Sequence, residues 1–322
     1  MKVIEHYQKA TEPLISFEII PPKRGGAISK VFNTLDELIR FKPPFIDVTS
    51  HAAEAYYEEL PDATIKRHVK RKRPGTIGLC AAIKHRYNVD PVPHLICKGF
   101  TKEETEDALI ELNYLGIQNV LAIRGDDNGA PKPHHKDKHI NEYAIDLVKQ
   151  ICLMNEGCFM EELVDAEPTN FCIGVGGYPE KHFEAPNLNR DIKLLKLKVD
   201  AGADYVVTQM FYDNQAFFKF VEQCRAEGIT VPIIPGLKVL TVPNHLTSLP
   251  RSFFVNIPDD LAEPILKNPD RTRDIGIEWS IKQCMELLEY GVQGLHFYVM
   301  GNPMPAIKVI ENLPLGQSLK VS

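Results

Sequence analysis

The sequence predicts a (β/α)8 TIM barrel, in which eight parallel strands alternate with helices along the chain. Three observations lead to this fold class. Short apolar runs alternate with amphipathic segments from end to end. The runs are rich in Val and Ile and show little polar alternation, which is typical of strands buried on both faces of a parallel sheet. They recur at a mean step of about 40 residues, and eight of them are more than an open doubly wound sheet usually has.

The individual elements are predicted from these runs and from the residues that punctuate them. Helices are expected at 101–116, 188–202, 214–228 and 271–291. In the first helix, Thr101 has the position of an N-cap, Glu104 completes a capping box, and Gly116 supplies a left-handed stop. The predicted strands are, in chain order, 14–20, 45–49, 75–82, 118–123, 171–175, 204–209, 231–235 and 294–299.

The chain has no internal linker rich in Pro, Gly or Ser, so we expect a single barrel domain over residues 1–322. Two polar stretches are long. Residues 125–139 follow the fourth predicted strand and would form a loop on the catalytic face of a barrel. Residues 241–274 form an elaborated connection between the seventh and eighth strands, where an extra helix is expected.

The composition excludes several classes of protein. Hydrophobic residues make up 44% of the chain and charged residues 25%, which rules out a disordered, collagenous or disulfide-scaffold protein. No apolar run approaches the roughly 18 residues of a membrane helix. The net charge of −6 argues against a nucleic-acid coat. The N-terminus lacks the apolar core of a secretory signal and the seven cysteines form no CxxC pair, so we expect a cytoplasmic protein with reduced thiols.

Glu18 is the first candidate for chemistry, because it interrupts an otherwise apolar strand just before Pro21 and Pro22. A carboxylate in such a strand is costly unless it points into a functional pocket, where it can act as a general acid. Asp47 and Thr49 close the second predicted strand. Thr49 can bind a ligand or be an ordinary strand residue.

Polar residues also end three later strands. Arg124, Gly125 and Asp126 follow the fourth strand, where the glycine suits close approach of the backbone to a ligand and the Arg–Asp pair suits a polar heterocycle. Gln209 ends the sixth strand with an amide that both donates and accepts, or is a satisfied residue at the barrel mouth. On the eighth strand Tyr298 lies nearer the end than His296, and is the better candidate.

Three other patterns are interpreted as structural. His134, His135 and His139 lie with Asp137 in a polar loop, but nothing else supports a metal site and we expect none. The basic run 66–73 is expected to be a solvated segment that leads into a strand.

The third pattern, GVGGYP at 174–179, lacks the spacing of a dinucleotide fingerprint and does not follow the first strand.

Taken together, the strand-end motifs resemble the methylenetetrahydrofolate reductases, which are FAD-dependent TIM barrels of one-carbon metabolism and methionine biosynthesis. The resemblance is to the short bacterial form and covers nearly the whole chain. Each motif alone is weak, but nine collinear matches are specific. They are SFEIIPP (16–22), FIDVT (45–49), PHLIC (93–97), LAIRGD (121–126), EYAIDLV (142–148), GYPEKHFEA (177–185), LKVDAGADYVVTQMFYD (197–213), VPIIPG (231–236) and LHFYVM (295–300).

The resemblance implies a role for each matching residue. Glu18 would be the general acid, Asp126 would lie beside the flavin and lower its potential, and Gln209 would contact the folate pterin, with Tyr298 near the site. The FAD site would be lined by Thr49, Ser50, Ala52, His94, Arg124, Gly125, Asp126, Tyr143, Ala144, Tyr178, His182, Ala185, Asp191 and Lys198.

The implied reaction is a ping-pong reduction of 5,10-methylenetetrahydrofolate to 5-methyltetrahydrofolate, with NADH or NADPH as the hydride donor and Glu18 protonating the leaving nitrogen. The implied partners are these small molecules, without nucleic acid or membrane, and the protein is expected to be a homo-oligomer. The chain departs from well-known bacterial relatives at Leu194 and Leu197, near the expected adenine end of FAD, and at Pro243 and Asn302, near the expected folate tail.

Two alternatives come from the residues themselves. A phosphate-binding barrel of the aldolase type would need a Schiff-base lysine, and the predicted strands contain none. A non-enzymatic RNA-binding protein would use the run 66–73, with an affinity that falls steeply with salt.

Overall fold

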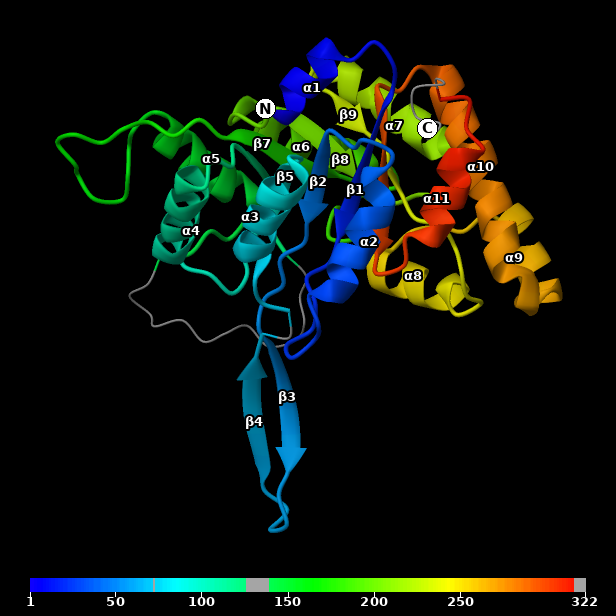
Figure 1. Cartoon of the computed structure of the whole chain (residues 1–322), viewed down its shortest axis with the longest axis horizontal. Helices are drawn as coiled ribbons and strands as arrows, with labels where there is room; N and C mark the ends of the chain where they lie inside the picture. Colours follow the sequence, from blue (N-terminus) through cyan, green and yellow to red (C-terminus); the bar gives the residue numbers. More distant parts are fainter. Residues whose placement is uncertain (72, 126–138, 316–322) are drawn as a thin grey trace.

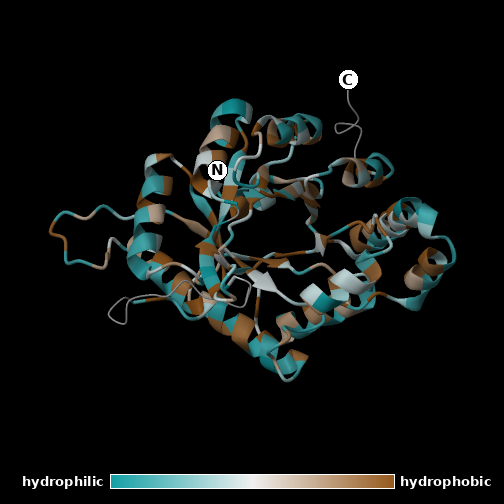
Figure 2. Cartoon of the chain, turned by 90° about the horizontal axis from the view of Figure 1, so that it is seen from below, coloured by the Kyte–Doolittle hydropathy of each residue, from teal (hydrophilic) through white to brown (hydrophobic). Residues whose placement is uncertain are grey.

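The structure is a computed structural model that describes residues 1–71, 73–125 and 139–315. Its main sheet consists of parallel strands that close into a barrel, and the helices surround it (Figure 1, Figure 2). The order around the sheet is β10-β11-β1-β2-β5-β6-β7-β8-β9. These strands are β1 (Leu14–Ile19), β2 (Phe45–Val48), β5 (Asp90–Ile96), β6 (Asn119–Ile123), β7 (Cys172–Gly177), β8 (Tyr205–Thr208), β9 (Ile233–Ile234), β10 (Gly236–Leu237) and β11 (Gly294–Met300).

The barrel closes through two very short strands that share one position. β9 pairs with β8 and β10 pairs with β11, and only Pro235 separates them along the chain. The Pro235 carbonyl still accepts a hydrogen bond from the His296 amide at 3.0 Å, so the seam continues across the proline. β9 and β10 together therefore act as the seventh of eight strands, and the predicted (β/α)8 barrel is confirmed.

The predicted strand at 75–82 is wrong, because this segment is part of helix α3 (Thr76–Tyr87). Its buried residues, Leu79, Cys80 and Ile83, have the spacing of one helix face. The third barrel strand is β5 instead, which pairs with β2 and β6. Its sequence DPVPHLI carries two prolines, which lack the amide of a ladder and usually argue against a central strand.

The four helices predicted from punctuation are confirmed as α4 (Lys102–Tyr114), α6 (Leu188–Asp200), α7 (Asn214–Ala226) and α10 (Thr272–Tyr290). The capping box of α4 forms as expected. The Thr101 hydroxyl accepts from the Glu104 amide at 3.1 Å, and the Glu104 carboxylate accepts from the Thr101 amide at 2.9 Å. The other helices beside the barrel are α2 (Ser29–Ile39), α5 (Ala144–Asn155) and α11 (Met304–Glu311).

The connection at 241–274 holds further helical elements. It contains α8 (His245–Phe253), α9 (Asp259–Lys267) and the 3-10 turn η1 (Pro269–Arg271). A separate apolar cluster holds it against the barrel, with Leu249 and Leu261 of the connection packed near Met210 and Tyr212.

The two ends of the barrel differ. Helix α1 (Val3–Lys9) closes the amino end, where Val3 and Tyr7 pack with Phe45 and Tyr205. Strands β1 and β2 point toward the opposite end, which is the lower end in Figure 1. Because ligand sites of this fold lie at the carboxyl ends of the strands, the open lower end is the place to look for one.

An antiparallel hairpin projects from this lower end (Figure 1). It consists of β3 (Glu54–Glu59) and β4 (Ile65–Lys70), which pair only with each other. The sequence did not predict it, because its strands are mostly polar and exposed and lie outside any core.

The basic run 66–73 begins on β4 and leads into a helix, not into the predicted strand. Its described residues do not act as one exposed patch. The Arg71 guanidinium lies 4.5 Å from the ring centre of Phe100, and Arg73 donates to the Pro21 carbonyl at 2.6 Å. These two arginines anchor the base of the hairpin to the barrel.

Candidate functional site

The carboxyl end of the barrel gathers three ionisable side chains: Glu18 on β1, Asp47 on β2 and His94 on β5. Glu18 is level with Asp47 in the strand register, and the neighbours Ile46 and Val48 pack outward in the main core. Because side chains alternate along a strand, Asp47 points into the barrel. Nε2 of His94 lies 3.5 Å from Oε2 of Glu18 and 3.4 Å from Oδ2 of Asp47.

The burial of this cluster changes its proton affinities. Asp47 is completely buried, and neither of its oxygens has a hydrogen-bond partner in the described part of the chain. Burial raises the pKa of Asp47 to about 7, and His296 acts in the opposite direction. Burial lowers the pKa of His94, and the charge of Glu18 partly opposes it. The cluster can therefore hold and exchange a proton near neutral pH.

Two residues on β11 adjoin the cluster. Nδ1 of His296 lies 2.8 Å from the Ser16 hydroxyl, and burial lowers the pKa of His296. The Tyr298 hydroxyl donates to the Thr208 carbonyl at 2.5 Å. Gly236 leaves room for this aromatic side chain, since a Cβ there would lie 2.4 Å from the Tyr298 oxygen. Tyr298 is thus fixed in the barrel wall, level with Glu18 in the register.

The rim beyond this layer carries Gln209 and Lys238. Gln209 follows β8 and is half-buried, and its side-chain oxygen accepts from the Met210 amide at 2.9 Å. Lys238 follows β10 directly. Burial lowers the pKa of Lys238, and the charge of Glu18 raises it, so the two side chains influence each other across the mouth. No role for Lys238 was predicted, because the predicted seventh strand ends at residue 235 and the sequence does not mark β10 as a strand.

A second cluster lies where β6 and β7 end. The Arg124 guanidinium forms an ion pair with Glu184 and lies 5.1 Å from the ring centre of Tyr143. Its Nε atom is buried without a hydrogen-bond partner among the described residues. Gly125, the next residue, has a φ of +85°, which a glycine adopts without strain. Ala144 begins α5 directly behind Tyr143.

The loop after β7 continues this cluster. The rings of Tyr178 and His182 meet edge to face with centres 4.7 Å apart. The Asp191 carboxylate accepts from the His182 amide at 2.7 Å, and Lys198 donates to the Gly176 carbonyl at 2.8 Å.

Burial also sets the proton affinity of Lys198 on α6. It lowers the pKa of Lys198 to about 8, and Asp191 opposes the shift. Ala185 lies buried in the loop after β7. The structure therefore brings together, beside the barrel mouth, those predicted residues between 124 and 198 that it describes.

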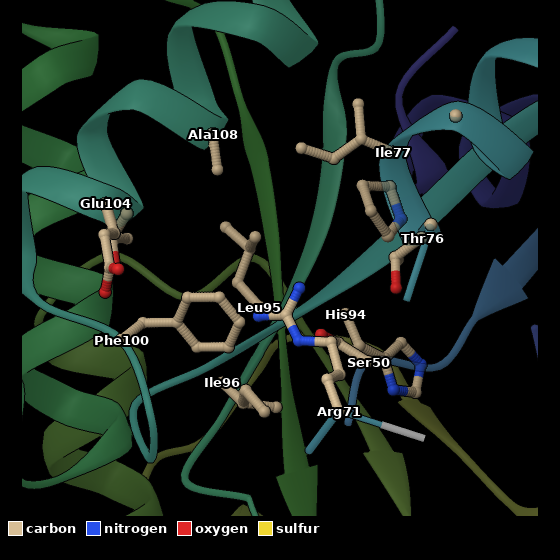
Figure 3. A pocket seen from close by; sticks show the side chains of 14 residues that line it. Ser50, Arg71, Thr76, Ile77, His94, Leu95, Ile96, Phe100, Glu104 and Ala108 are labelled. Carbon is tan, nitrogen blue, oxygen red and sulfur yellow. The ribbon is translucent and has the colours of Figure 1, made fainter. Parts of the chain in front are cut away.

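A cavity of about 200 Å³ opens next to His94, between α3, α4 and β5 (Figure 3). Ser50 lines it, as do Thr76 at the start of α3 and Phe100, over whose ring Arg71 lies. The remaining two predicted residues of this region lie nearby. The Thr49 carbonyl accepts from the Thr76 hydroxyl at 3.0 Å, and a Cβ at Gly99 would come within 3.2 Å of Ala52.

Some predictions lie outside the described residues. Asp126, which the resemblance places beside the flavin, is one of them, as are His134, His135 and Asp137. Within the described ranges, no group of three His, Cys, Asp or Glu side chains is placed to hold a metal ion. Across the same ranges, each helix is too short or too polar to span a lipid bilayer.

The fold and the cluster define an α/β barrel with a buried acid–base centre at the carboxyl end of its strands. The sequence model for methylenetetrahydrofolate reductase matches residues 3–314, so the chain belongs to the methylenetetrahydrofolate reductase family.

Two relatives show the range of the similarity. The chain is 33% identical to methylenetetrahydrofolate reductase (NADH) 1 of Arabidopsis thaliana, over 100% of its own length and 52% of the plant protein. It is 30% identical to the 5,10-methylenetetrahydrofolate reductase of Salmonella typhimurium, over 89% of the chain and 86% of the bacterial protein. The chain thus spans about half the length of its plant relative.

A similar solved structure has the same fold at low sequence identity. It is described as an uncharacterized protein from Clostridium thermocellum that binds two copies of 5-methyl-5,6,7,8-tetrahydrofolic acid. The TM-score is 0.58 and the identity 13%, over 96% of both chains, so the likeness concerns the barrel alone.

Proposed function

We propose that this chain reduces 5,10-methylenetetrahydrofolate to 5-methyltetrahydrofolate, with NADH or NADPH as hydride donor and FAD as its bound cofactor. Membership of the family supports the reaction. The observation that carries the proposal in this chain is Glu18, a buried carboxyl at the barrel mouth, 3.5 Å from the imidazole of His94. An acid in this position is what opening of the methylene bridge requires.

The second cluster fits an elongated anionic cofactor. Arg124 and Lys198 supply cationic side chains, and the buried Nε of Arg124 is a donor that a ligand oxygen would satisfy. The aromatic rings of Tyr178 and His182, which meet edge to face, offer ring surface to a bound cofactor. FAD, when bound, would accept a hydride from the nicotinamide and pass it to the folate. The arginine and lysine would hold its phosphates, since the net charge of the chain is −6 and attraction must be local.

The remaining residues would act on the folate. Glu18 would protonate the leaving nitrogen of the imidazolidine ring. Gln209 at the rim would offer its amide to the pterin, and the fixed ring of Tyr298 would form one wall of the substrate site. Leu194 and Leu197 on α6 are exposed and would give the expected adenine end an apolar surface. Because both substrates would use the same mouth, they would bind in turn.

The test separates the two half-reactions in a stopped-flow instrument. We expect Glu18→Gln to take up FAD and to be reduced by the nicotinamide at the parent rate, but to reduce the folate at least about a hundredfold more slowly. Glu222→Gln, an exposed change on α7, is the matched control and should behave as the parent. A Glu18→Gln variant with parental folate reduction would contradict the role of the acid. A pure parent protein that stays colourless with added FAD would contradict the cofactor.

Lys238 gives a reason to test the aldolase-type alternative as well. It lies at a strand end in the barrel mouth, and burial lowers its pKa, as a Schiff-base lysine needs. Borohydride reduction in the presence of small aldehydes and ketones, followed by mass spectrometry, would detect a trapped adduct. We expect none at Lys238.

The expected assembly and organisation remain proposals too. Sedimentation velocity would test whether the chains form a homo-oligomer. Limited proteolysis would test whether each chain is a single domain.

A further inference from the structure

The barrel interior holds a buried carboxyl for which the proposed reaction has no use, namely Asp47. We propose that Asp47 is a proton reserve for Glu18: once Glu18 has given up its own proton, the two carboxyls share the proton of Asp47 through Nε2 of His94, and Asp47 thereby returns Glu18 to its acid form during turnover. This inference rests on the proposed function and adds a residue that touches neither folate nor flavin to its proton path.

The geometry places one nitrogen between two carboxyls. Nε2 of His94 lies 3.4 Å from Asp47 and 3.5 Å from Glu18, and it has no hydrogen-bond partner among the described residues. Both Asp47 oxygens are likewise unpartnered in the described part of the chain. Two ionised carboxylates that lie this close to one buried atom repel each other, and each charge is costly to bury. The repulsion and the desolvation cost both fall when one of the carboxyls holds a proton. The structure thus favours one shared proton over two full charges.

The surrounding groups do not neutralise Asp47. Its nearest basic neighbours are His94 and His296, and burial lowers the pKa of both, which favours neutral imidazoles. Lys238 acts on Glu18 from the rim. Burial raises the pKa of Asp47 to about 7, so the carboxyl releases and regains a proton in the physiological range. The other titratable groups that Asp47 influences are Tyr7 on α1, Cys80 on α3, Tyr205 on β8 and Tyr298 on β11.

The proton step balances without any further reactant. After Glu18 has given its proton to the folate nitrogen, Glu18 is a carboxylate and Asp47 is a neutral acid. His94 begins as the neutral tautomer with its proton on Nδ1. The Asp47 proton moves to Nε2, and the same proton then moves to Oε2 of Glu18. The result is a neutral Glu18, a neutral His94 and an Asp47 carboxylate, which takes its next proton from solvent after the product leaves.

The first experiment follows the pH dependence of the folate half-reaction. Flavin-loaded, pre-reduced Asp47→Asn and parent proteins are mixed with methylenetetrahydrofolate between pH 6 and pH 9. Asparagine keeps the shape but cannot hold the proton. The rate of folate reduction should fall as pH rises, and in Asp47→Asn we expect this descending limb of the pH profile to shift to lower pH by about one unit. At pH 8 this shift makes the variant about tenfold slower, while flavin reduction by the nicotinamide is unchanged. Thr34→Val, which removes a buried hydroxyl on α2 away from the cluster, should leave the limb in place.

The second experiment detects protonation of the two carboxyls directly, in the absence of turnover. Infrared difference spectra of the flavin-loaded protein are recorded through a pH titration. The parent should lose a carboxylic-acid band near pH 7, and Asp47→Asn should lack that band. In Glu18→Gln the midpoint should fall, because the neighbouring charge is gone.

The two experiments distinguish failure of the shared proton from failure of the proposed function. A limb that does not move in Asp47→Asn, or a midpoint unchanged in Glu18→Gln, overturns the shared proton. If Asp47→Asn fails to fold, the Glu18→Gln titration still decides. If the parent reduces no folate at any pH, the proposed function fails, and the infrared coupling then shows separately whether the two carboxyls exchange a proton.

Discussion

Asp47→Asn should also change how the stability of the protein depends on pH. The pKa of this carboxyl rises from 3.8 to about 7 on folding, because it is buried with no hydrogen-bond partner among the described residues. Between these values the folded chain binds more protons than the unfolded chain, so the free energy of unfolding falls as pH rises. A rise of about three pKa units is worth about 4 kcal/mol at 1.36 kcal/mol per unit. Somewhat over a third of this is already lost at pH 5, and most of the remainder is lost between pH 5 and pH 8.

Asparagine has no charge to bury, so the variant should lack this decline. Urea unfolding at pH 5 and pH 8, followed by far-ultraviolet circular dichroism, measures the free energy of unfolding of parent and variant at one flavin concentration. The stability of Asp47→Asn relative to the parent should be about 2–3 kcal/mol greater at pH 8 than at pH 5. Asp107→Asn on the exposed side of α4 is the control and should give equal differences. Equal differences for Asp47→Asn as well would refute the burial of an uncompensated carboxyl.

Two further predictions follow from the barrel mouth. Gly236→Ala places a Cβ 2.1 Å from the Thr208 carbonyl and 2.4 Å from the Tyr298 hydroxyl, so it should lower the free energy of unfolding by about 1–3 kcal/mol, as urea titration would show; a change below about 1 kcal/mol would contradict the packing. Lys238→Met removes a cation that acts on Glu18, so the descending limb of the folate half-reaction should move up by as much as about one pH unit, opposite to Asp47→Asn; a downward shift would count against this influence.

The barrel was predictable because its strands carry their signal locally. Apolar runs alternate with amphipathic helices at a mean step of about 40 residues, and six of the eight predicted strands coincide closely with strands of the barrel. The failure at 75–82 has a local cause: an apolar run of eight residues suits a buried strand or a buried helix face equally well. The neighbouring β5 was hidden by Pro91 and Pro93, whose burial in a central strand depends on the pairing of the whole sheet.

The candidate site was predictable where a polar residue interrupts an apolar strand. Glu18 gave this signal, and Asp47 gave the same one, but its neighbour His94 lies on a strand that was not predicted. The contact between all three depends on which strands become adjacent, and this is a property of the closed sheet. Lys238 follows a strand of only two residues, too short to mark a strand end in the sequence.

The split seventh strand has a consequence for how the barrel comes apart. Every other position of the sheet is a strand of at least four residues, but β9 and β10 pair through two residues each on either side of Pro235. Cooperative local opening begins where the fewest backbone hydrogen bonds must break at once. The barrel therefore has a seam, and β11, with His296 and Tyr298, borders it. Transient opening of β9 and β10 would let water reach Glu18 and Asp47 through the wall of the barrel, while the pairing between β1, β2 and β5 stays intact.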